Sequence, residues 1–62
     1  MKRYTFKCVR VGGPGPAVHI DNCADDTAAE ERALRLFELW PLAVKIDVVE
    51  DERHFEILRP AG

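Results

Sequence analysis

Residues 27–40 constrain the fold most, because their apolar periodicity, start signal and stop signal all agree. The apolar residues follow the spacing of one helical face, and they are Ala29, Ala33, Leu36, Phe37 and Trp40. Thr27 and Glu30 match a capping box, in which each side chain satisfies a backbone N–H of the first turn. Pro41 ends the helix, because proline disfavours the α conformation at the preceding residue. The sequence therefore predicts one amphipathic helix over residues 27–40.

Four short segments around this helix alternate between apolar and polar residues, which is the pattern of half-buried strands. Two precede the helix and two follow it: residues 4–11, 17–20, 44–49 and 54–58. A chain of 62 residues has room for one domain only. We therefore expect a single α+β domain over residues 1–62 in ββαββ order, with one four-stranded sheet that the helix covers on one face.

Two strand orders fit this layout. In the order 2-1-4-3, the first and last strands are parallel neighbours at the centre, as in the β-grasp layout. In the order 2-1-3-4, every neighbouring pair is antiparallel. We favour the first order, because it places the charge-bearing third strand and the proline-led second strand at the edges.

The first hairpin is expected to turn through residues 12–16, whose glycines allow positive φ and whose prolines withhold backbone donors. With this loop centred on Pro14, Cys8 lies opposite Ile20, and both Val18 and Ile20 face the core. The loop is not expected to bind phosphate, because a strand rather than a helix follows it.

The second hairpin pairs Val48 with Phe55 and Ile46 with Ile57, so that the apolar residues of both strands share one face. A four-residue turn over 50–53 is favoured, because a two-residue type I′ turn would force positive φ on a glutamate. The sheet side of the predicted core then consists of Tyr4, Phe6, Cys8, Val18, Ile20, Val44, Ile46, Val48, Phe55 and Ile57.

Composition excludes several classes of function. The net charge of −2 and the pI near 5.6 argue against a nucleic-acid or anionic-membrane partner, since both usually require a clustered basic surface. The sequence has neither a run of about 18 apolar residues nor a signal-peptide pattern. We therefore expect a soluble cytoplasmic protein with two reduced cysteines, Cys8 buried and Cys23 half-exposed near the start of the helix.

Candidate chemistry is sparse. His19, His54 and Cys23 are the residues that a small metal-dependent regulator or enzyme would use, but their spacing matches no recurring metal motif. Asp47 and Glu56 are expected to lie opposite each other on the open face, where a flat sheet offers no cleft to separate their pKa values. We predict no catalytic residue and no cofactor.

The open sheet face is the more informative surface. Apolar residues and histidines are expected to gather there as the centre of a partner-binding site: Val9, Val11, His19, Val49, His54 and Leu58. The third strand, residues 44–49, offers a second route, because an exposed edge without proline can accept another strand. We therefore expect an interaction module that binds a protein partner, or itself as a weak homodimer.

Four segments follow a pattern shared with other chains: the opening strand Tyr4-Thr5-Phe6, a glycine-rich turn, the helix with Ala33-Leu34, and the closing segment over residues 46–57. Through these segments the chain resembles a family of short bacterial proteins of unknown function. The resemblance implies the hairpin-helix-hairpin layout and no activity. The layout also looks like that of bacterial immunoglobulin-binding domains, but a shared fold does not imply a shared function.

Overall fold

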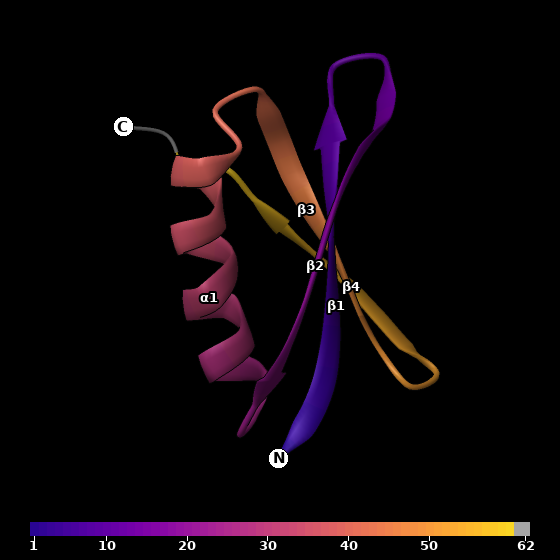
Figure 1. The fold of residues 1–62 in the computed structure, drawn as a ribbon, viewed down its shortest axis with the longest axis vertical. Helices are drawn as coiled ribbons and strands as arrows, with labels where there is room; N and C mark the ends of the chain where they lie inside the picture. Colours follow the sequence, from indigo (N-terminus) through magenta and orange to yellow (C-terminus); the bar gives the residue numbers. More distant parts are fainter. Residues whose placement is uncertain (61–62) are drawn as a thin grey trace.

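A computed structural model describes residues 1–60. The elements are β1 (Lys2–Arg10), β2 (Gly13–Cys23), α1 (Asp26–Leu39), β3 (Ala43–Glu50) and β4 (Arg53–Leu58). The strands form one sheet in the order β2-β1-β3-β4, with every neighbouring pair antiparallel. The helix runs along one side of the twisted sheet (Figure 1). The predicted α+β fold in ββαββ order is confirmed.

The sheet adopts the fully antiparallel order, and the β-grasp order that we favoured is wrong. The third strand lies in the interior of the sheet and cannot serve as an edge, so the edges are β2 and β4. Burial explains this choice, because Ile46 and Val48 of β3 are fully buried, whereas Phe55 and Ile57 of β4 are only partly buried. The more apolar strand takes the position that the helix covers best.

The first hairpin differs from the prediction in its turn and in its register. The chain turns at Val11 and Gly12, and the expected loop over 12–16 is mostly part of β2. Gly12 and Gly13 take φ values of 94° and 138°, which glycine adopts without a Cβ clash. Ile20 therefore lies opposite Thr5 instead of Cys8. An odd shift in register moves every side chain of a strand to the other face.

The new register corrects three predicted core positions. Val18 and Ile20 lie on the open face and are 55% and 59% exposed. Val44 is 41% exposed, and Ala43 is buried in its place, because the pairing of β3 with β1 shifts between Val9 and Arg10. The predicted core residues Phe55 and Ile57, and Trp40 of the helical stripe, are partly buried and pack against the core. The buried cluster itself consists of Tyr4, Phe6, Cys8, Cys23, Ala29, Ala33, Leu36, Phe37, Ala43, Ile46 and Val48.

The second hairpin confirms the predicted register, with Val48 opposite Phe55. Its turn contains two residues rather than the four that we favoured, since Glu50 pairs directly with Arg53. Asp51 alone among the non-glycine residues of 1–60 has positive φ, at 55°. Aspartate tolerates this conformation better than most residues, so the turn needs no glycine.

The N-cap of the helix lies two residues before the predicted one, and the helix begins at Asp26. Asp25 is the N-cap, and its Oδ1 accepts a hydrogen bond from the backbone N–H of Ala28 at 2.9 Å. The predicted capping box of Thr27 and Glu30 is therefore wrong. Trp40 closes the other end by donating its backbone N–H to the carbonyl of Leu36 at 2.8 Å. The predicted apolar stripe is confirmed, because its members are buried or packed against the core.

Candidate functional site: the open sheet face and its edges

The open face consists of three rows of side chains that run across the strands. One end row contains Ile20, Thr5, Val49 and His54, and the middle row contains Val18, Lys7, Asp47 and Glu56. The third row contains Val9, Lys45 and Leu58. These rows follow from the strand register alone. They place the charged residues in the centre of the sheet and at β4, and the apolar pair Val18 and Ile20 on β2.

The charges at the centre of this face neutralise one another. Lys45 forms an ion pair with Glu56, which lowers the pKa of the Glu56 carboxyl and raises the pKa of Lys45. Asp47 lies opposite both Glu56 and Lys7, so the predicted carboxylate pair is confirmed and is flanked by lysines. His54 Nε2 is 4.0 Å from Asp47 Oδ1. The lowered pKa of Glu56 is the opposite of the raised pKa that a general acid needs.

The exposed pair Val18 and Ile20 was missed by the sequence analysis. Both side chains are more than half exposed, and they lie two residues apart on the outermost strand. Leu58, at the opposite edge, is 68% exposed, but its strand also carries the exposed His54 and Glu56. The apolar surface at the β2 edge is therefore less interrupted by charge than the surface at the β4 edge.

The residues predicted for the binding surface lie in different places and differ in exposure. Val49, His54 and Leu58 lie on the open face as expected. Val9 also lies there, but it is buried, with only 8% of its surface exposed. Val11 belongs to the tight turn that follows β1 and is 88% exposed. These four residues of the sheet and the turn residue therefore do not form one continuous exposed patch.

His19 was predicted on the open face, but the structure places it on the helix-covered face. It pairs with the buried Phe6, and the two ring centroids are 6.0 Å apart, so His19 lies on the helix-covered side of β2. Its Nε2 is 3.7 Å from Asp21 Oδ2, and Arg32 of α1 approaches the same oxygen at 3.0 Å through its Nε. His19 and Asp21 thus form the polar border of β2 on the side opposite to Val18 and Ile20.

The residues of the alternative metal site do not converge. His19 lies on the helix-covered face and His54 on the open face, at the two different edge strands. Cys23 is buried rather than half-exposed, and burial, followed by the charge of Asp21, raises the pKa of its thiol. Within residues 1–60, no group of three or more potential ligands comes together.

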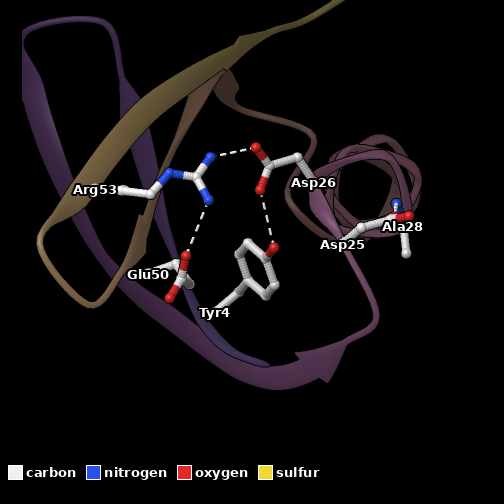
Figure 2. A network of polar contacts seen from close by, with 6 residues as sticks. All are labelled: Tyr4, Asp25, Asp26, Ala28, Glu50 and Arg53. Carbon is white, nitrogen blue, oxygen red and sulfur yellow. Dashed lines mark hydrogen bonds and ion pairs between the residues drawn. The ribbon is translucent and has the colours of Figure 1, made fainter. Parts of the chain in front are cut away.

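A polar network closes one end of the domain (Figure 2). The buried Tyr4 donates its hydroxyl to Asp26 Oδ1 at 2.9 Å, and the other oxygen of Asp26 accepts from Arg53. Arg53 also contacts Glu50 Oε1 at 3.0 Å. Burial and the Asp26 carboxylate raise the pKa of Tyr4 to about 12, whereas Arg53 and then Tyr4 lower the pKa of Asp26. The network joins β1, α1 and the β3–β4 hairpin, which indicates a structural role.

An apolar hollow of 230 Å³ lies at the other end, between the end of the helix and the first hairpin. Trp40, Leu39 and Leu42 line it from one side, and Pro16 and Ala17 line it from β2. Its volume is below the roughly 300 Å³ at which small-molecule sites usually begin. The hollow therefore adds apolar surface next to β2.

Neither the family models, nor the curated proteins, nor the solved structures compared with this chain gave a match. The one helix within residues 1–60 is too short and too polar to cross a bilayer.

Proposed function

We propose that this protein is a small interaction module whose binding element is the edge strand β2. A partner protein contributes an extended segment that adds to this edge as a further strand. One observation carries the proposal: Val18 and Ile20 are 55% and 59% exposed on a stretch of edge, residues 17–23, that contains no proline. An edge strand presents unpaired backbone N–H and C=O groups, which are the template for strand addition.

The two edges of the sheet differ in how they discourage such pairing. Proteins protect edges with prolines and charged side chains, and β4 carries the exposed Arg53, His54 and Glu56 within its six residues. The first half of β2 is protected by Pro14 and Pro16, which cannot donate to a ladder. Residues 17–23 lack both prolines and lysines. This half of β2 is therefore the part of the sheet best suited to accept a strand.

The side chains of β2 determine which strands fit. Val18 and Ile20 face the open side and favour a segment with apolar residues at alternate positions. On the other side, His19 and Asp21 favour a segment that brings a complementary charge. A protein partner accounts for this alternation better than a nucleic acid, because the net charge of −2 provides no basic surface.

The alternative function, a metal-dependent regulator that uses His19, His54 and Cys23, has less support. The sheet separates the two histidines, and Cys23 is buried. A reducing cytoplasmic location belongs to the proposal, and it is supported by the two free and buried thiols of Cys8 and Cys23.

Photo-crosslinking tests the proposed edge directly. A photoreactive amino acid replaces Val18 in one variant and Leu58 in a matched variant, and each is irradiated in cells that express the protein. We expect protein adducts from position 18 and few from position 58, although Leu58 is the more exposed of the two residues. Equal yields from both positions, or no adduct from position 18, would contradict the proposal.

A further inference from the structure

We infer that the strand added to β2 is the β2 strand of a second copy of this chain, so that two molecules form one continuous eight-stranded sheet. This inference rests on the proposed function of the β2 edge. The two copies pair antiparallel around a twofold axis that passes beside Ile20. Such a contact is isologous, because the same residues contribute from both copies.

The proline-free stretch of β2 has a natural centre of symmetry. Residues 17–23 extend three positions to either side of Ile20. If Ile20 of one copy lies opposite Ile20 of the other, all seven residues find a partner, and Pro14 and Pro16 stay outside the shared ladder. Ile20 is 59% exposed in the single copy, so the pairing covers apolar surface at the axis itself.

This register also pairs each histidine with an aspartate. It places His19 of each copy opposite Asp21 of the other, and both side chains lie on the helix-covered side of the sheet. Directly opposite side chains in an antiparallel pair have Cβ atoms about 5 Å apart, which is close enough for an ion pair with a protonated histidine. The symmetry of the contact forms this pair twice.

The neighbouring symmetric registers are less favourable. An axis at His19 would place the two histidines opposite each other and Asp21 opposite Ala17, so no charge is paired. An axis at Val18 would bring Ile20 opposite Pro16, which cannot donate a hydrogen bond to the ladder. Of these three registers, the axis at Ile20 is the one that keeps proline out of the ladder and places His19 opposite Asp21.

The size of the contact indicates a weak, reversible dimer. Two edge strands joined over seven residues bury less than the roughly 1,200 Å² of stable specific interfaces. The protein should therefore pass between monomer and dimer as its concentration changes. Helices of both copies lie on the same side of the joined sheet, and the open face continues across the junction through Val18 and Ile20.

Sedimentation of the purified full chain tests the dimer. We expect the wild-type mass to rise toward twice the monomer value with increasing concentration. Ile20→Lys places two like charges together at the axis and should weaken association at least about tenfold, a difference of about 1.4 kcal/mol. Leu58→Lys at the opposite edge is the matched control and should associate as the wild type does. Circular dichroism verifies that both variants are folded.

Cysteine crosslinking tests the register. Under oxidation with copper phenanthroline, Ile20→Cys should form a disulfide between two copies much faster than Val18→Cys, because the proposed axis places Val18 opposite Asn22. Faster crosslinking of Val18→Cys would overturn the register. A wild-type chain that stays monomeric at every concentration would overturn the dimer, while adducts from position 18 with a different protein would leave the proposed function intact.

Discussion

Arg59 donates a hydrogen bond from its guanidinium to the backbone carbonyl of Trp40 at 2.8 Å, and so caps the helix from outside. The same group reaches the carbonyl of Phe37 at 3.3 Å and lies over the Phe37 ring, 4.7 Å from its centroid. Its Nε donates to the carbonyl of Ala43 at 2.7 Å. The last turn of α1 contains no basic residue. Arg59, which follows β4, therefore provides the positive charge that the C-terminal end of a helix favours.

Arg59→Ala should lower the free energy of unfolding by about 1 to 2 kcal/mol, because it removes charge-assisted hydrogen bonds to three carbonyls. Urea unfolding followed by the fluorescence of Trp40, the only tryptophan, measures the change. Arg35→Ala, at an exposed helical position, is the control and should have a much smaller effect. Equal losses in the two variants would show that the cap does not stabilise the fold.

Tyr4 should ionise near pH 12 in the folded protein, because burial and its hydrogen bond to Asp26 oppose the phenolate. Because the pKa of Tyr4 is raised on folding, its contribution to the free energy of unfolding is fully present below pH 10 and is lost as the pH rises through about 12. Since Tyr4 is the only tyrosine, its ultraviolet absorbance can be titrated directly. An ordinary titration near pH 10 in the folded chain would contradict the observed network.

Asp26 should link stability to acid pH in the opposite direction. Its folded pKa is lowered, first by Arg53 and then by Tyr4, so its contribution is present above the unfolded pKa of about 4 and is lost as the pH falls through the lower folded value. Urea midpoints measured from neutral to acid pH should fall less steeply for Asp26→Asn than for the wild type. Parallel curves would indicate that the carboxylate is not stabilised by folding.

The positive φ of Asp51 in the β3–β4 turn can be tested by substitution. Asp51 has φ of 55°, which a β-branched residue adopts only with strain, so Asp51→Val should cost about 1 to 2 kcal/mol of stability. Glu52→Val, at the adjacent turn position without positive φ, should cost clearly less. Thermal or urea unfolding compares the two variants, and a larger loss for Glu52→Val would contradict the observed turn.

Local patterns predicted those parts of the fold in which every signal agreed. The predicted register of the second hairpin was correct, because Val48 and Phe55 can share a buried face in only one register. The start of the helix was less well determined, since Asp25, Asp26 and Thr27 are all capable caps. A contact distant in sequence favours the observed choice, because Asp26 is held by Tyr4 and Arg53.

The predicted turn and register of the first hairpin were wrong, for a physical reason that also concerns the binding site. The sequence predicts Pro14 and Pro16 as loop residues, but an edge strand tolerates prolines whose missing donors face away from the sheet. The pair Gly12-Gly13 was the signal for a tighter turn. With that turn, Val18 and Ile20 move to the open face, and the most exposed apolar residues of the β2 edge could have been anticipated.

Strand order could not be derived from the sequence, because both orders bury the same faces under the helix. The distinction depends on how fully β3 and β4 are covered, which is a property of the assembled core. The same limit applies to Arg59, whose carbonyl partners lie 16 to 22 positions earlier in the chain. No local pattern identifies such contacts.

Amide hydrogen exchange as a function of protein concentration tests the pairing of two copies through the β2 edge most directly. Outward-facing backbone amides in residues 17–23 should exchange quickly in dilute protein and become protected as concentration rises, because a second copy then pairs with them. The amides of β4 should be unaffected. Protection that stays constant in residues 17–23, or that increases along β4 instead, would contradict the pairing of two copies through β2.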